Sequence, residues 1–176
     1  KGSIKHKIYF ERAQLKRRHL NDFNGALKDY TSSIKFNPKY IRAYMYRGLL
    51  YERNFSDPEA AERDYRKSIA YDSECGACWM QLAYLSERLS SDEMLEATEK
   101  ALKYGISLQF DGKFAPPFPL YGRLANIKSR DDDYLGAIES YQRLIDNYQE
   151  FDSDGDGEMD ETDYLDGAYE SISRMQ

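Results

Sequence analysis

The chain has 176 residues and a formal net charge of −6 at pH 7; 41% of its residues are hydrophobic and 14% are aromatic. This composition excludes an intrinsically disordered chain, which contains few apolar and aromatic residues. No apolar run approaches the roughly 20 residues that span a bilayer, so we expect no membrane span.

The charge is distributed unevenly along the chain. Residues 146–176 contain eleven acidic residues and one base, Arg174, whereas the remaining 145 residues carry a net charge of +4. The basic excess lies in Lys1–Arg18, and such a stretch can bind nucleic acid or an acidic partner. Neither an aromatic platform motif nor a glycine-rich phosphate loop accompanies it. We therefore favour a solvated helix face and expect no nucleic-acid binding.

Two helices open the chain. The first is predicted over Ile4–Leu20 from its apolar spacing. The second follows a turn at Asn21–Asn24 and ends at Asn37-Pro38, because proline cannot donate to the helix ladder and disfavours helical geometry in the residue before it. On one face of the second helix a small residue lies four positions before an aromatic one. The pattern recurs at Ala26, Tyr30 and Ser33; Ala61, Tyr65 and Ser68; and Ala137, Tyr141 and Leu144.

A second sequence pattern occurs in the helices that precede these copies. In it a bulky aromatic residue is followed four positions later by a small one. The pairs are Tyr44 and Gly48, Trp79 and Ala83, and Tyr121 and Ala125. Residues four apart lie on one helix face, so the small residue leaves room for a neighbouring helix. The spacing is 34 residues from Phe10 to Tyr44 and 35 from Tyr44 to Trp79.

This pattern resembles the tetratricopeptide repeat (TPR), a helix–turn–helix unit of about 34 residues that stacks into a superhelix. The resemblance implies an all-α fold, a right-handed α-solenoid of about four hairpins. We place the solenoid at residues 1–151, with repeats at about 7–40, 41–75, 76–108 and 118–151. Gln14 stands where the family prefers glycine. In the third copy Met94 and Thr98 stand where alanine and an aromatic residue are expected.

The remaining helices are predicted in pairs, with Asp57-Pro58 and Ser90–Asp92 as helix-start signals. An insert at 104–117 breaks the repeat spacing, and Pro116-Pro117 excludes it from a helix interior. We favour a plain surface loop, with packing against the solenoid, which its phenylalanines suggest, as the alternative. The predicted pairs are Ile41–Arg53 with Ala61–Ala70, Cys78–Leu89 with Asp92–Lys103, and Leu120–Arg130 with Tyr134–Tyr148.

Cys75 and Cys78 form a CxxC sequence at the start of the third repeat. Such a pair can be redox-active, half of a zinc site, a structural disulfide or simply two small residues in a tight repeat junction. The histidines, His6 and His19, lie two repeats away, which argues against zinc. A thioredoxin-like βαβ context is absent. We favour two small residues at the junction, with a disulfide as the main alternative.

The acidic segment DSDGDGEMDETD, residues 152–163, resembles the calcium loop of the EF-hand, with carboxylates at loop positions one, three and five and glycine at position six. Asp163 closes the loop where the family usually has glutamate, a form that also looks like bacterial dockerin loops and lets Mg²⁺ compete with Ca²⁺. A solvated acidic linker is the alternative. The implied ligands are Asp152, Asp154, Asp156, Glu158, Asp160 and Asp163.

EF-hands normally pair, and this loop has no second copy, so we interpret it as a structural clip. A helix is predicted over Glu161–Arg174, with Leu165, Ala168 and Tyr169 on one face. It is placed to cover the last apolar face of the solenoid, because an end repeat needs such a cap. We treat residues 148–176 as one unit of loop and capping helix.

No catalytic constellation is present, so we expect a non-enzymatic protein. The TPR resemblance implies a concave groove that binds a protein or peptide segment, without the Lys/Asn/Arg clamp of chaperone-binding members. The alternative for each candidate is that it only packs helices. The groove candidates are Glu11, Leu15 and Arg18; Arg42, Met45, Leu49 and Glu52; Met80, Tyr84 and Glu87; and Asn126.

Two functions remain open at this point. In the first, the protein is an interaction scaffold with a structural Ca²⁺ site. In the second, Ca²⁺ regulates binding of the partner. The sequence does not identify the partner or the oligomeric state. The dockerin-like loop and the cysteine pair lean towards a secreted or periplasmic protein, with the cytoplasm as the alternative.

Overall fold

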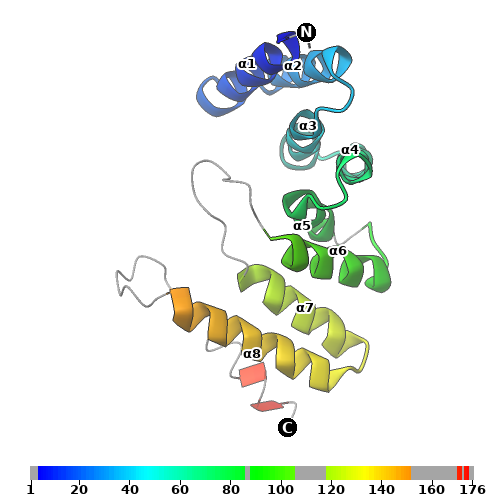
Figure 1. Ribbon diagram of the computed structural model, residues 1–176, viewed down its shortest axis with the longest axis vertical. Coiled ribbons are helices and arrows are strands. Elements are labelled where there is room, and N and C mark those ends of the chain that lie inside the picture. The colour runs from blue at the N-terminus through cyan, green and yellow to red at the C-terminus, as the bar shows by residue number, and fades with distance from the viewer. Residues whose placement is uncertain (1–3, 86–87, 106–117, 152–169, 172, 175–176) are drawn as a thin grey trace.

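The computed structural model describes residues 4–85, 88–105, 118–151, 170–171 and 173–174. Over these residues the chain forms eight α-helices and no strand, and the helices stack in series with α1 and α8 at opposite ends (Figure 1). This arrangement confirms the predicted all-α solenoid.

The helices pair into four hairpins, within which the most extensive contacts are made, and α2–α3, α4–α5 and α6–α7 join successive hairpins. Most helix boundaries lie within three residues of those predicted. The helices are α1 (Lys5–His19), α2 (Phe23–Phe36), α3 (Ile41–Asn54), α4 (Pro58–Tyr71), α5 (Gly76–Tyr84), α6 (Ser91–Tyr104), α7 (Phe118–Arg130) and α8 (Tyr134–Phe151).

Helix α5 differs from its prediction at both ends. It begins at Gly76 instead of Cys78, because Cys75 is its N-cap residue and accepts a hydrogen bond from the backbone N–H of Cys78. It ends at Tyr84 rather than Leu89, because Leu85 leaves the helical region at φ −78° and ψ 50°. Leu85 and Leu89 are nevertheless buried, so the segment after α5 still contributes to the core.

The second helix of each hairpin begins with a polar side chain that accepts a hydrogen bond from a backbone N–H three residues later. The acceptors are Asp22 (2.8 Å), Asp57 (2.9 Å), Ser90 (3.3 Å) and Asp133 (3.0 Å). Such caps satisfy N–H groups that have no partner inside the helix. The predicted helix starts at Asp57-Pro58 and Ser90 are confirmed, the latter as a full capping box with Glu93.

Gly48, the small residue predicted on α3, receives an aromatic side chain from α4. At Gly48, an added Cβ would lie 2.6 Å from Cε1 of Tyr65. Tyr65 is fully buried at this contact, and its hydroxyl donates to Glu52 at 2.6 Å. A continuous buried cluster extends from Phe10 in α1 to Ile127 in α7.

A second repeated feature crosses the first two hairpins. Arg12 donates to Asp29, and Arg47 donates to Asp64, in both cases through two guanidinium nitrogens. The two arginines are 35 residues apart, and so are the two aspartates. The third hairpin has Leu82 and Ala97 at the corresponding helix positions, and both are buried.

Several predictions fall outside the described residues. These are most of the insert, the whole acidic loop and most of the helix at 161–174, of which Glu170–Ser171 and Ser173–Arg174 are described and helical. Within the part of the chain that is described, no helix is both long and apolar enough to cross a bilayer.

Candidate functional site

The first helices of the four hairpins, α1, α3, α5 and α7, carry the predicted partner contacts, and we call the surface they form the first-helix surface. The structure leaves Glu11, Leu15 and Arg18 exposed on α1, with 57% of Leu15 accessible to solvent. Arg42, Tyr84 and Asn126 are also exposed, on α3, α5 and α7. These six residues therefore have side-chain surface that is exposed to solvent.

Three apolar candidates have the opposite environment. Met45, Leu49 and Met80 are buried, with no more than 5% of any of them exposed. Their side chains pack between helices, which is the alternative that the sequence analysis left open for each groove candidate. Glu52 is half-buried and accepts the hydrogen bond from Tyr65. Glu87 lies outside the described residues.

A hollow of about 170 Å³ separates the N-terminal ends of α3 and α5. Ile41, Arg42 and Met45 line it from α3, and Asp72 and residues 74–78 line it from the start of α5 and the loop before it. The Arg42 guanidinium lies 5.1 Å from the ring centroid of Phe10 on α1. Arg42 is thus the predicted groove residue with the clearest access to a cavity.

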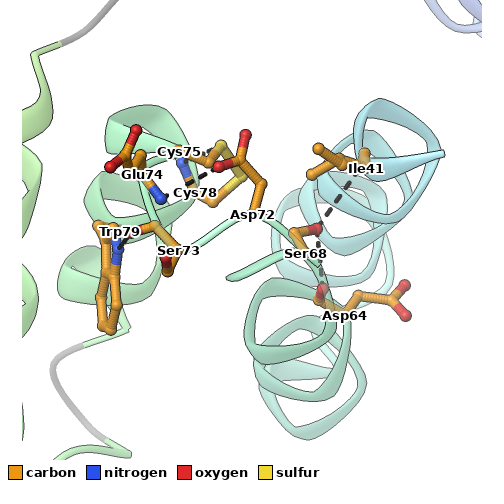
Figure 2. Close-up of a disulfide and its surroundings, with 9 residues drawn as sticks. All are labelled: Ile41, Asp64, Ser68, Asp72, Ser73, Glu74, Cys75, Cys78 and Trp79. Atoms are coloured by element: carbon orange, nitrogen blue, oxygen red, sulfur yellow. Dashed lines mark hydrogen bonds between the residues drawn. A yellow bond between two sulfur atoms is a disulfide. The ribbon is translucent and has the colours of Figure 1, made fainter. Parts of the chain in front are cut away.

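Cys75 and Cys78 are joined by a disulfide at the edge of this hollow (Figure 2). The sequence interpretation favoured two separate small residues, and the structure instead has the disulfide that was the alternative. The preceding loop is held by two hydrogen bonds. Asp72 accepts from the N–H of Glu74 at 3.1 Å, and the Trp79 indole donates to the carbonyl of Ser73 at 2.9 Å.

Gly76, which follows Cys75, packs closely against the end of α6. A Cβ on Gly76 would collide with the carbonyl oxygen of Gly105, which follows α6. Only glycine lets the start of α5 come this close to the end of α6. The CGAC sequence therefore serves hairpin packing and disulfide placement together.

Arg123 on α7 is a further first-helix residue, which the sequence prediction missed. Its guanidinium lies 5.5 Å from the ring centroid of Tyr84, and Nη2 contacts the sulfur of Met94 at 3.7 Å. Its Nε is buried and has no hydrogen-bond partner among the described residues. Burial lowers the pKa of Arg123, and Tyr84 opposes this only in part. The guanidinium therefore gains from an added carboxylate.

A larger hollow of about 390 Å³ lies among α6, α7 and α8. It is lined by cations and carboxylates together, including Lys103, Lys128 and Glu99. Arg143 at its edge pairs with Glu139 at 2.7 Å. This mixture of charges selects no ligand class.

The six predicted calcium ligands, Asp152 to Asp163, lie outside the described residues. Elsewhere, in the described parts of the chain, no group of three or more His, Cys, Asp or Glu side chains could hold a metal ion. The Ca²⁺ site, with Mg²⁺ as a competitor, stays a prediction from sequence.

No protein-family model matches this sequence, and no curated protein is significantly similar to it. Solved structures are similar in fold. The crystal structure of MamA protein matches with a TM-score of 0.67 and 18% identity over 98% of this chain and 90% of that one. BtubC (BKLC) from P. vanneervenii matches with a TM-score of 0.66 and 16% identity, over 84% of this chain and 65% of that one.

The first TPR of Spaghetti (RPAP3), solved with the HSP90 peptide SRMEEVD, also matches. Its TM-score is 0.60 and its identity 16%, over 73% of this chain and 94% of that one. Identities this low show the fold alone. The chain is thus a TPR-like helical-repeat solenoid.

Proposed function

We propose that this chain is a non-enzymatic interaction scaffold of the TPR type, whose first-helix surface binds an extended segment of a partner protein. The observation that carries the proposal is the row of accessible side chains along successive first helices, Arg42, Tyr84, Arg123 and Asn126, with a hollow between α3 and α5. A stacked-hairpin solenoid presents such a row as one extended binding surface.

Two features indicate the chemistry of the bound segment. The guanidinium of Arg123 is half-buried and burial lowers its pKa, and a carboxylate of the segment beside the guanidinium would stabilise its charge. Tyr84, whose ring the Arg123 guanidinium contacts, keeps 37% of its surface exposed and adds apolar surface for a side chain of the segment. We therefore expect a segment that combines an acidic residue with an apolar one. The similar TPR structure solved with a peptide supports this class of partner.

The proposal is tested by selecting linear peptides from a displayed library and measuring their affinity by fluorescence anisotropy. Tyr84→Ala and Arg123→Met are each expected to weaken binding about tenfold, because anchor residues in a binding groove carry most of the binding energy. Arg143→Ala, on the second helix α8, is the control and is expected to bind unchanged. The proposal fails if the selected peptides bind the first-helix variants as tightly as the wild type.

We further propose that the loop at Asp152–Asp163 binds Ca²⁺ and that this ion is structural. The spacing of carboxylates and glycine in the sequence supports this. A Ca²⁺-regulated adaptor is the second candidate. Affinity for the selected peptide that is equal in Ca²⁺ and in chelator, after both samples are shown to be folded, supports the structural role. An affinity that depends on Ca²⁺ supports regulation.

A further inference from the structure

The two sulfurs of the Cys75–Cys78 disulfide have unequal surroundings. Cys75 is the half-buried N-cap residue of α5, whereas Cys78, in the first turn, is fully buried. Figure 2 shows the disulfide at the N-terminal end of α5, on the side that faces Ile41 of α3. Both cysteines border the hollow, but only Cys75 has solvent-exposed surface, so an incoming nucleophile can reach Cys75 and not Cys78.

The helix terminus also distinguishes the two sulfurs. The backbone N–H of Cys78 donates to Sγ of Cys75 at 3.2 Å. A donor at a helix N-terminus stabilises negative charge on the sulfur it faces, and a thiolate in this position is the reactive form of cysteine. Once the disulfide is opened, Cys75 is the sulfur that these groups hold as thiolate.

The hollow gives a thiol access to the disulfide. Arg42 and Met45 of α3 line it together with both cysteines, and so do the carboxylates Asp72 and Glu74. The attacking species in thiol–disulfide exchange is a thiolate, which reaches the half-buried Cys75 through this hollow. A fully buried structural disulfide would have no such access.

We propose that Cys75–Cys78 is an exchangeable disulfide, which forms a mixed disulfide through Cys75 with a thiol on the segment bound at the first-helix surface. The thiolate of the segment attacks Sγ of Cys75. The bond between Cys75 and Cys78 breaks as the new bond forms, and Cys78 leaves as a thiolate that takes a proton from water. In reverse, Cys78 attacks Cys75, restores the disulfide and releases the segment thiol.

This exchange involves no external oxidant, because one disulfide is made as another is broken. The inference rests on the proposed function only in assuming that the thiol belongs to the bound segment. The exchange itself can be measured with a small thiol. Since Cys78 is buried, its thiolate is poorly stabilised and returns to Cys75. The mixed disulfide therefore accumulates when Cys78 is removed.

Glutathione is the probe. Folded Cys78→Ser protein is incubated with oxidised glutathione, quenched in acid and weighed by intact mass spectrometry, with Cys75→Ser as the matched control. We expect Cys78→Ser to gain one glutathione and Cys75→Ser to gain one only after unfolding in urea. Equal modification of the two folded variants, or none of Cys78→Ser, would overturn the proposal.

A second measurement uses the wild type, in case a variant does not fold. The disulfide is reduced with a phosphine under native conditions, and the alkylation rate of each cysteine is followed by peptide mass mapping. Cys75 is expected to react about tenfold faster than Cys78 because only Cys75 is accessible and held as thiolate. Equal rates, or reduction that occurs only in urea, contradict the proposal.

Binding of a cysteine-free selected peptide separates this inference from the proposed function. If that peptide binds and glutathione exchange fails, only the exchangeable disulfide is wrong. If glutathione exchange succeeds and no peptide binds, the disulfide is reactive and the proposed scaffold function is wrong.

Discussion

Arg47 donates two hydrogen bonds of 2.7 Å to the carboxylate of Asp64, across the second hairpin from α3 to α4. Both side chains are largely covered, with 17% of Arg47 and 7% of Asp64 exposed. Burial by itself lowers the pKa of Arg47, but the carboxylate outweighs burial and raises it. The guanidinium therefore stays charged and depends on Asp64 for compensation.

Asp64→Ala is expected to lower the free energy of unfolding by about 3–5 kcal/mol, because it leaves a largely buried guanidinium without its carboxylate. The double variant Arg47→Leu with Asp64→Ala copies the third hairpin, which has Leu82 and Ala97 at these positions. It is expected to recover most of that loss, because replacing both partners of a buried pair by apolar residues is often close to neutral. Urea unfolding of the three proteins measures both changes. A double variant no more stable than Asp64→Ala would contradict this explanation.

Asp29 is the corresponding carboxylate of the first hairpin, and its pKa is set by a cation besides the arginine. Burial raises the pKa of Asp29, but hydrogen bonds from Arg12 and Lys16 outweigh it and hold the pKa below its usual value of 3.8. Lys16 lies 2.9 Å from Asp29. The unfolded chain therefore binds this proton more readily than the folded one, and lowering the pH favours unfolding.

Asp29→Asn tests this pH dependence. The stability that Asp29 contributes is fully present above its unfolded pKa and is lost as the pH falls through its folded pKa. The difference in unfolding free energy between wild type and Asp29→Asn should be largest near about pH 7 and shrink as the pH falls below about 4. Denaturant titrations at several pH values measure it. A difference that is constant with pH would show that the charge on Asp29 does not stabilise the fold.

Two glycines in the first helices have different surroundings and form a matched pair of substitutions. An added Cβ at Gly48 would lie 2.6 Å from the Tyr65 ring, whereas at Gly122 the nearest atom is Cδ1 of Leu144 at an ordinary 3.5 Å. Gly48→Ala is expected to destabilise the protein by about 1–3 kcal/mol through overpacking. Gly122→Ala is expected to stabilise it by about 0.4–1 kcal/mol, because alanine lowers the conformational entropy of the unfolded chain. Thermal melts followed by circular dichroism measure whether each variant has a lower or a higher melting temperature than the wild type. Equal changes in melting temperature for the two variants would refute the packing argument.

Much of the fold could be predicted from sequence because its signals are local. Pro38 ends α2, Asp57 and Ser90 cap helices, and Gly48 makes room for Tyr65, all at nearly constant spacing. The early end of α5 could not be predicted, because Leu85 and Leu89 continue the apolar pattern after the backbone leaves the helix. A hydrophobic pattern indicates burial and does not by itself indicate helical geometry.

The candidate site could be predicted only in part. Repeat positions indicate the average direction of a side chain, and the apolar Met45 and Met80 are buried in the core despite their positions. Arg123 occupies a repeat position outside those considered, and its contact with Tyr84 depends on how two hairpins stack. The repeated Arg–Asp pair was detectable, since Arg12 and Arg47 recur with the same spacing as Asp29 and Asp64.

The acidic loop yields the last prediction. If Asp152–Asp163 binds Ca²⁺, the ion neutralises clustered carboxylates and binds only the folded loop, so Ca²⁺ raises the melting temperature in a concentration-dependent way. Mg²⁺ is expected to raise it less, because it is smaller and demands stricter geometry. Asp152→Ala with Asp156→Ala should abolish the shift, whereas Asp166→Ala, outside the loop, should leave it unchanged. Differential scanning calorimetry in Ca²⁺, Mg²⁺ and chelator measures these shifts. Identical melting of the wild type in Ca²⁺ and in chelator would mean that the segment is a solvated acidic linker.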